Sequence, residues 1–231
     1  MPTKRPYRVA RRLDPRDLAT RLYESRVPLG VAVIVLLLAI LGWWSYRTLQ
    51  DEREQAAQTL LTKSLQVLEK APEGSGSGKP QGTKSGLVEA LQLLGRVRQQ
   101  YPASKAAEQA LLQIGHIFYQ LGKYQEALQA YQDYLEQYPT GWWVLLAGLG
   151  KGHALEAQGH YEEAAATFRN LTERYKNSAF TVEALMRLGR SLERLNRRSE
   201  AIAVYRRVVE EYAGTSWSLQ AEKGLAYLER Q

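Results

Sequence analysis

The sequence predicts an all-α fold: a solenoid of helical hairpins with a 37-residue period, preceded by a single transmembrane helix. Two observations predict it. Residue types recur in register every 37 residues from Glu89 onward. A stretch of 20 residues without a charge also lies near the N-terminus, between Arg26 and Arg47. The 231-residue chain as a whole is 45% hydrophobic and 24% charged, an ordinary globular composition.

The positive charge of the chain is concentrated at its N-terminus. Residues 1–26, a predicted basic cytoplasmic tail, hold eight of the 31 Lys and Arg residues and three of the 24 Asp and Glu residues. The other residues are nearly neutral, whereas a nucleic-acid-binding domain is expected to have a basic face. We therefore expect no nucleic acid partner. The chain has no cysteine, which excludes disulfides, thiolate catalysis and zinc sites made by cysteine.

Residues 27–46 form the predicted transmembrane helix. A helix of 20 residues spans about 30 Å, the thickness of the bilayer hydrocarbon. Trp43, Trp44 and Tyr46 close the segment as an interfacial aromatic belt does. A cleaved signal peptide ends in small residues, whereas these three side chains are bulky, so cleavage is not expected. A buried helix of a soluble protein is the other alternative, but an uninterrupted apolar run of this length favours lipid.

The basic flank predicts the orientation of this helix. Lys and Arg residues dominate before it, whereas Arg47 and Arg53 after it are mixed with acidic residues. The positive-inside rule places the N-terminus in the cytoplasm and the remaining chain in the periplasm, with the helix in a bacterial inner membrane. The opposite orientation, with the repeats in the cytoplasm, stays open.

The repeat is visible as columns of identical residues. The four columns are Tyr101, Tyr138, Tyr175 and Tyr212; Glu89, Glu126, Glu163 and Glu200; Ala90, Ala127, Ala164 and Ala201; and Ala110, Ala147, Ala184 and Ala221. Such self-similarity is the signature of a repeat architecture, in which stacked hairpins bury a shared core.

Each repeat unit is predicted to contain two helices. In the clearest copy, Ser104 caps a helix that runs to about Leu121, and Gly122 ends it in the left-handed conformation. The second helix covers residues 124–138. The corresponding turn residues in the next copies are Gly159 and Asn196, and the corresponding caps are Ser178 and Thr215. Small residues such as Gly115 leave space that Tyr131, Phe168 and Tyr205 are expected to fill.

These residues resemble the tetratricopeptide repeat family. The pattern appears as Leu111-x2-Ile114-Gly115-x2-Phe118, then Ala127-x3-Tyr131, then Pro139. The departures are a period of 37 in place of 34, Leu111 for the usual tryptophan, and Lys176 and Ala213 in place of the proline. The resemblance covers residues 85–230 and implies a solenoid that binds proteins.

The parts around the repeats complete the predicted organisation. Residues 47–72 are expected to continue from the membrane helix and pack against the first repeat. Residues 73–86 form a predicted flexible Gly/Ser loop. Residues 87–231 form the solenoid, which a helix from Ser216 to Arg230 caps. A membrane anchor that enters such a repeat also resembles a bacterial family that includes the ancillary Sec translocon subunit and a cell-division coordinator. That resemblance implies single-span interaction modules facing the periplasm.

The first helices of the repeats are expected to line a groove for segments of other proteins. By position in the family pattern, the groove residues are Gln109, Leu112, His116, Tyr119, Leu146, Leu149, His153, Glu156, Glu183, Met186, Arg190 and Glu193. His116 and His153 share one repeat position, but two histidines without a carboxylate or thiolate make a poor zinc site. We expect no metal, no cofactor, no small-molecule substrate and no catalysis.

Trp142 and Trp143 allow two interpretations. Burial inside the central repeat is the first, and it is the one that we predict. The second is a hot spot for a partner or for the membrane surface, since tryptophan favours both places.

The sequence thus predicts a membrane-anchored periplasmic adaptor with chaperone-like contacts. Its predicted partners are translocon components, secreted clients or envelope assembly factors. A structural scaffold of an envelope or cell-division assembly is the alternative function.

Overall fold

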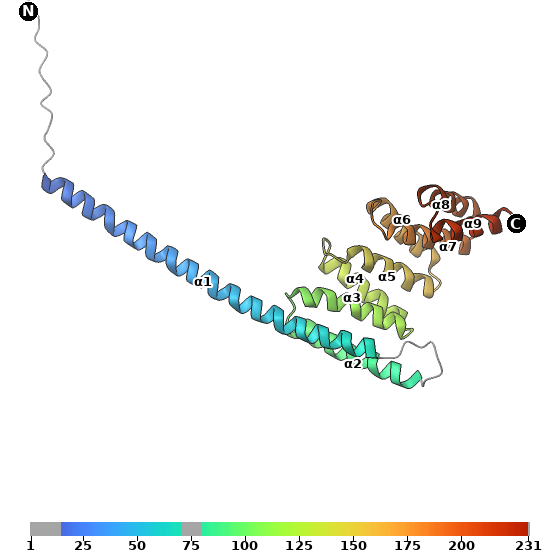
Figure 1. The fold of residues 1–231 in the computed structure, drawn as a ribbon, viewed down its shortest axis with the longest axis horizontal. Helices are drawn as coiled ribbons and strands as arrows, with labels where there is room; N and C mark the ends of the chain where they lie inside the picture. The colour runs from blue at the N-terminus through green and yellow to red at the C-terminus, as the bar shows by residue number, and fades with distance from the viewer. Residues whose placement is uncertain (1–14, 71–79, 231) are drawn as a thin grey trace, which may run out of the picture. The chain divides into compact units, whose positions relative to one another are not determined.

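A computed structural model describes residues 15–70 and 80–230, and every helix or strand in these two ranges is an α-helix (Figure 1). The predicted all-α solenoid is confirmed. The chain divides after Glu52 into two units. The second unit, from Arg53 onward, contains the stacked repeats.

The described part of the first unit, residues 15–52, belongs to α1 (Pro15–Lys70). This helix is long and apolar enough to cross a membrane. Its large apolar side chains described between Val31 and Leu49 are exposed; Leu38, Trp44 and Tyr46 each keep 63% of their surface accessible. Helical structure begins at Pro15, within the predicted basic tail of residues 1–26. A proline is well suited to that first helical position, where its missing N–H leaves no hydrogen bond unmade. Residues 1–14 lie outside the described ranges.

The second unit begins with the last turns of α1. Ala57 and Leu61 are buried in one cluster with Leu94 and Val97 of α2 (Pro80–Gln100) and with α3 (Lys105–Gln120). The predicted loop over residues 73–86 is too long at its C-terminal end, because α2 already begins at Pro80. Here too, a proline stands at the first position of the helix, where its fixed φ angle suits the helical backbone. Residues 71–79 are not described.

The following helices form hairpins in chain order. They are α3 with α4 (Tyr124–Gln137), α5 (Val144–Ala157) with α6 (Tyr161–Arg174), and α7 (Thr181–Arg194) with α8 (Arg198–Glu211), followed by α9 (Ser216–Glu229). The three predicted turn residues are confirmed: Gly122, Gly159 and Asn196 have φ angles of 73°, 80° and 56°. Left-handed backbone at these positions ends the first helix of each hairpin.

Two of the three predicted caps are confirmed. The hydroxyls of Ser104 and Thr215 accept hydrogen bonds from the amides of Ala107 and Ser218. The prediction for Ser178 is wrong, because α7 begins three residues later and has Phe180 as its N-cap. A turn precedes the helix there: the amide of Thr181 donates to the carbonyl of Ser178 at 3.0 Å.

Small residues and aromatic rings interlock between the helices of each hairpin. A Cβ atom on Gly115 would lie 2.8 Å from the ring of Tyr131. A Cβ atom on Gly152 would lie 2.4 Å from the ring of Phe168, and one on Gly189 would lie 2.4 Å from the ring of Tyr205. The expected filling of this space by the three rings is therefore observed. One continuous hydrophobic core runs from α3 to α9.

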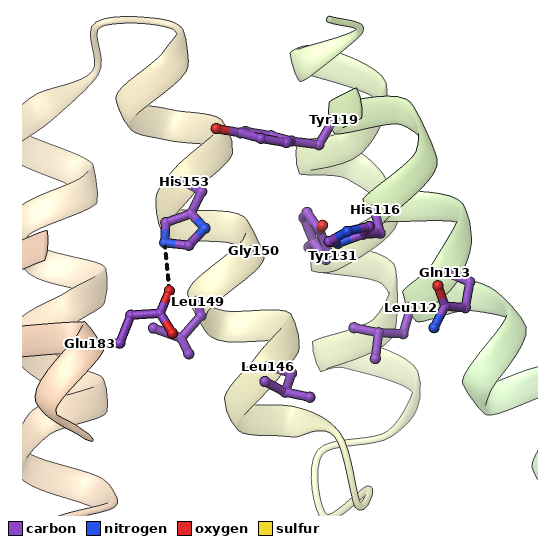
Figure 2. Close-up of a pocket in the computed structure, with 10 residues that line it drawn as sticks. All are labelled: Leu112, Gln113, His116, Tyr119, Tyr131, Leu146, Leu149, Gly150, His153 and Glu183. Carbon is purple, nitrogen blue, oxygen red and sulfur yellow. Dashed lines mark ion pairs between the residues drawn. The ribbon is translucent and has the colours of Figure 1, made fainter. Parts of the chain in front are cut away.

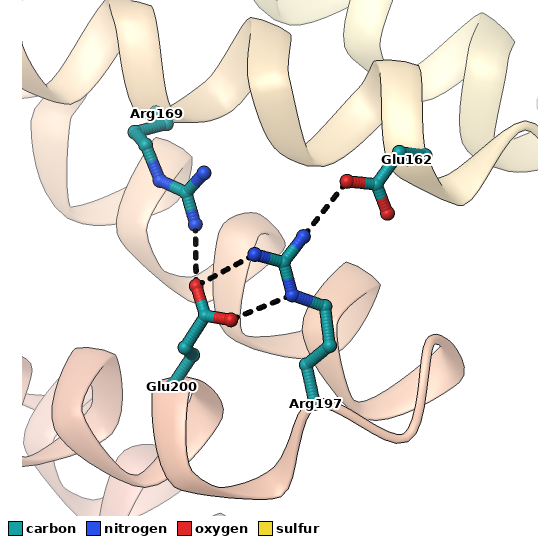
Figure 3. A network of polar contacts seen from close by, with 4 residues as sticks. All are labelled: Glu162, Arg169, Arg197 and Glu200. Carbon is teal, nitrogen blue, oxygen red and sulfur yellow. Dashed lines mark hydrogen bonds and ion pairs between the residues drawn. The ribbon is translucent and has the colours of Figure 1, made fainter.

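Polar contacts also join neighbouring hairpins at the surface (Figure 3). Arg197 donates to Glu162 on α6 at 2.7 Å and to Glu200 on α8 at 2.6 and 3.0 Å. Arg169 on α6 donates to the same Glu200 at 2.9 Å. The hydrogen bonds from Arg197 lower the pKa of Glu200, and Glu200 in turn raises the pKa of Arg197. This network connects the last two hairpins without being buried.

Candidate protein-binding face

Most of the predicted groove residues on α3, α5 and α7 lie on one side of the solenoid. We call this side the first-helix face. Helical residues three, four and seven positions apart lie on one side of a helix. Leu112, His116 and Tyr119 satisfy that spacing on α3, and the 37-residue period repeats the arrangement on α5. The face therefore follows from the repeat itself.

A hollow of about 340 Å³ lies between α3 and α5 on this face, and we call it the leucine hollow. It is lined by Leu112, Gln113, His116, Tyr119, Tyr131, Leu146, Leu149, Gly150, His153 and Glu183. Figure 2 shows the side chains of the two helices facing each other across it, with Tyr119 at one end and Leu146 at the other. Leucine and tyrosine carbons make most of its surface, so it suits an apolar side chain.

Tyr131 reaches this hollow from the second helix α4 because two glycines make room for it. A Cβ atom on Gly150 would lie 2.3 Å from the Tyr131 ring, and one on Gly115 would lie 2.8 Å from it. The ring is 3% exposed. Burial raises the pKa of the Tyr131 hydroxyl, so the phenol stays neutral.

Burial lowers the pKa of both histidines of the leucine hollow. Burial, with smaller contributions from Arg187 and His116, lowers the pKa of His153 to about 4. Its Nε2 lies 3.5 Å from a carboxylate oxygen of Glu183, but a neutral imidazole makes no ion pair with it. His116 is exposed at the rim, and the partial burial that it does have lowers its pKa. The two histidines thus add polar atoms to a largely apolar hollow, and their lowered pKa values favour the neutral imidazole.

A second hollow of about 260 Å³ adjoins the first and shares Tyr119 and His153 with it. We call it the arginine hollow. It is lined by Tyr119, His153, Glu156, Ala157, Tyr161, Arg187, Arg190 and Arg194. Three guanidinium groups and one carboxylate stand in it, so its net charge is positive.

The single carboxylate of the arginine hollow is already engaged. Glu156 accepts hydrogen bonds from the hydroxyl of Ser191 at 2.8 Å and from Arg187 at 3.4 Å. Burial raises the pKa of Glu156, and these donors oppose that effect. Arg194 lies over the ring of Tyr161, with 5.8 Å between the guanidinium carbon and the ring centroid. Arg190 and Arg194 are both exposed.

The structure brings together nine of the twelve predicted groove residues in these two hollows. Gln109, Met186 and Glu193 line neither hollow. Met186 is 3% exposed and belongs to the core, because its side of α7 packs against neighbouring helices. Leu149 lines the leucine hollow but is also 3% exposed, so it forms the floor and not a projecting contact.

Arg187 and Arg194 were not among the residues predicted from the sequence. The signal was present, because Arg187, Arg190 and Arg194 follow a helical spacing of three and four residues on one side of α7. Tyr131 was expected as a packing residue only. It was missed at the hollow because it comes from a second helix.

The predicted burial of the tryptophan pair is wrong for Trp142, which is 87% exposed. Trp143 is partly buried and packs against the core. Hydrogen bonds hold the turn in which both lie. Glu108 accepts from the amide of Trp142 at 3.1 Å, and the hydroxyl of Tyr134 accepts from the amide of Trp143 at 3.0 Å. These bonds fix the turn before α5, and the Trp142 side chain projects from it.

Comparison with known proteins identifies the repeat. Two tetratricopeptide repeat family models match the chain, one over residues 109–141 and the other over residues 149–215. The hairpins within these two ranges are similar to tetratricopeptide repeats. The comparison with curated proteins finds no significant match for this sequence.

Solved protein structures share this fold. A tetratricopeptide repeat protein from Parabacteroides merdae aligns at 19% identity with a TM-score of 0.60, covering 76% of this chain and 60% of that one. This chain therefore spans less than two thirds of that protein. MamA from Desulfovibrio magneticus RS-1, in a form that begins at residue 41, aligns at 17% identity with a TM-score of 0.53 and covers 75% of this chain and 93% of that one. At these identities the similarity concerns the fold.

Proposed function

We propose that this protein is a membrane-anchored adaptor that binds segments of other proteins on its first-helix face. The observation that carries the proposal is the pair of adjoining hollows between α3, α5 and α7. Tetratricopeptide repeats typically serve protein binding, and a concave surface with apolar walls and a few polar groups is the usual form of a binding site.

Photo-crosslinking in cells tests the face. A photoreactive residue replaces His116 or Arg190, which are exposed on the first helices. Exposed Gln129 on α4 and Glu173 on α6 provide matched controls on the second helices. We expect adducts from the first two positions and few from the controls. Equal adducts from all four positions, or none from His116 and Arg190, would contradict the proposal. Leu149 and Met186 are poor positions, because both are buried.

We further propose that α1 anchors the protein in a bacterial inner membrane with its repeats in the periplasm. The length and apolar composition of α1 support the anchor, and the basic residues before it support the orientation. Protease added to spheroplasts should then degrade the repeats while the membrane remains intact. Degradation only after lysis would instead favour repeats that face the cytoplasm.

Association with the translocon and chaperone-like contacts with secreted proteins form the most specific part of the proposal. It rests on the likeness of a membrane anchor followed by such repeats to the Sec-associated and cell-division family. Identification of the crosslinked proteins tests it. Adducts that contain neither translocon components nor secreted proteins would contradict the association with the translocon. They would not contradict the adaptor function.

A structural scaffold is the second candidate, and Trp142 favours it. A tryptophan that is 87% exposed on a turn held by hydrogen bonds resembles the anchor residues of protein interfaces. A photoreactive residue at Trp142 should then give a single adduct, with a second copy of the chain or with one fixed partner. A heterogeneous set of adducts, or none, would count against the scaffold.

A further inference from the structure

We propose that the first-helix face selects protein segments in which an apolar side chain and an acidic side chain lie a few residues apart. The apolar side chain enters the leucine hollow, and the Asp or Glu carboxylate pairs with Arg190 and Arg194 in the arginine hollow. This inference rests on the proposed function, and it adds the chemistry of the partner.

The two hollows are close enough to be filled by one short segment. They share Tyr119 and His153 as common walls, so no other element separates them. One residue of an extended chain covers about 3.3 Å. A segment that seats a side chain in one hollow therefore places a side chain only a few residues away at the other.

The leucine hollow does not favour a charged side chain. Its floor is made of Leu112, Leu149 and the ring of Tyr131, all of which are nearly buried. The imidazole of His153 is neutral at physiological pH and offers no charge to an acid. Glu183 is the only carboxylate in the lining of this hollow, and it would repel an acidic side chain.

The arginine hollow has the opposite character. Glu156 accepts hydrogen bonds from Ser191 and Arg187, which leaves Arg190 and Arg194 without a direct ion pair to a carboxylate in the lining of the hollow. The next carboxylate along α7 is Glu193, and burial together with this carboxylate raises the pKa of the Tyr205 hydroxyl. Arg190 has a long contact of 3.5 Å to Gln220, and Arg194 stacks on Tyr161.

Both arginines keep free donors for a partner. A guanidinium group offers five N–H donors in a planar fork that matches a carboxylate. A neutral amide acceptor and an aromatic face use few of them. Among the described residues, neither Arg190 nor Arg194 has a carboxylate within ion-pair distance. A carboxylate from a bound segment supplies the missing charge.

The test uses the full-length protein in a nonionic detergent and a phage-displayed library of random peptides. Selection should enrich peptides that combine an apolar residue with Asp or Glu a few positions away. The affinity of one selected peptide is then measured by fluorescence anisotropy. The double variant Arg190→Glu/Arg194→Glu should bind it at least about tenfold more weakly, because losing a charge-assisted contact and gaining a repulsive one both raise the dissociation constant.

A matched double variant controls for net charge. Arg174 lies over the ring of Tyr175 at 5.9 Å, much as Arg194 lies over Tyr161, and Arg198 is exposed on α8. The variant Arg174→Glu/Arg198→Glu therefore makes the same charge change on the second helices. We expect its affinity to stay within about twofold of the wild type, since distant exposed charges are screened by salt. An equal loss in both double variants would overturn the inference.

Changes in the peptide separate this inference from the proposed function. Replacing the peptide acid by its amide should weaken binding to the wild type about tenfold. The same replacement should strengthen binding to the Arg190→Glu/Arg194→Glu variant, because it removes the repulsion between the peptide acid and the introduced carboxylates. Peptides that bind the face without preferring an acid would overturn the inference and leave the adaptor function intact. A loss of binding when the peptide C-terminus is amidated would show that a terminal carboxylate is recognised, which also overturns it. If no peptide binds the first-helix face, the proposed function itself fails.

Discussion

At the scale of single residues, the floor of the leucine hollow depends on the absence of two side chains. Tyr131 comes from α4 and passes between Gly115 on α3 and Gly150 on α5. A methyl group at either glycine would overlap the ring, because protein interiors are packed as densely as organic crystals. The packing of the Tyr131 ring against the two glycines therefore determines both the shape of the hollow and the stability of the hairpin.

The substitution Gly150→Ala tests this packing. The new Cβ would lie 2.3 Å from Tyr131, and the ring is too buried to move freely. We expect a loss of about 1–3 kcal/mol in the free energy of unfolding, measured by denaturation followed by circular dichroism. Gly95→Ala is the control, because nothing lies within 4 Å of its added Cβ. It should stabilise α2 by about 0.5–1 kcal/mol. Equal effects of both substitutions would refute this account.

His153 links stability to pH. Its folded pKa of about 4 lies below the ordinary value of 6.5, so the unfolded chain binds the proton more readily. Stability from this residue is present above pH 6.5 and declines as the pH falls toward 4. We expect His153→Gln to remove about 2 kcal/mol of the decrease between about pH 7 and about pH 5. Urea denaturation of both proteins at the two pH values measures it. Parallel losses in both would exclude His153 as the cause.

At the scale of helices, the sequence predicted the turns better than the starts. Gly122, Gly159 and Asn196 were predictable because few residues adopt a left-handed backbone readily. The start of α7 was not, since Ser178 has the type of a cap but a backbone turn delays the helix to Thr181. Hydrogen bonds in the preceding turn determine where such a helix begins, and the local residue pattern does not show these hydrogen bonds.

The same limit applies to the candidate site. The period placed Leu112, His153 and Arg190 on one face, because that follows from helix geometry alone. It did not show that Met186 turns into the core or that Trp142 projects from its turn. Burial depends on which helices stack against a residue, and a single repeat pattern does not show how closely they stack.

The surface network around Glu200 is expected to matter only at low ionic strength. Glu200→Gln removes the charge that Arg169 and Arg197 share. The melting temperature of the variant should be slightly lower than that of the wild type at about 50 mM salt, and the difference should shrink at about 1 M salt, because exposed ion pairs are screened. Exposed Glu210 on the same helix gives the control substitution Glu210→Gln. A difference that persists unchanged at high salt would show that the network does not act through charge.

At the scale of the whole chain, the last turns of α1 belong to the repeats. Ala57 and Leu61 share a buried cluster with α2, and the carboxylate of Glu54 accepts hydrogen bonds from the amides of Lys105 and Ala106 at 2.9 and 3.3 Å. Those amides lie in the first turn of α3, where a negative charge is favourable. The helix that carries the proposed anchor thus also completes the first hairpin.

Two fragments test this dual role. A fragment of residues 53–231 should be soluble and unfold at a higher temperature than a fragment of residues 80–231. The shorter one exposes the apolar side of α2, including Leu87 and Leu94, which α1 otherwise covers. Thermal unfolding by circular dichroism compares them. Identical melting temperatures would show that the α1 residues contribute nothing to the repeats.

The outer side of α9 gives the stack of hairpins an accessible end. Leu219 and Tyr227 on this helix are 59% and 60% exposed, although Ala221 and Leu228 on its other side are buried. In repeat proteins each unit contacts mainly its neighbours, so stability grows by nearest-neighbour additions. An engineered hairpin fused behind α9 could dock on that side and lengthen the array, while both hollows, several helices away, keep their geometry. Added hairpins of this kind would give engineered binding proteins that contact a longer segment of their target.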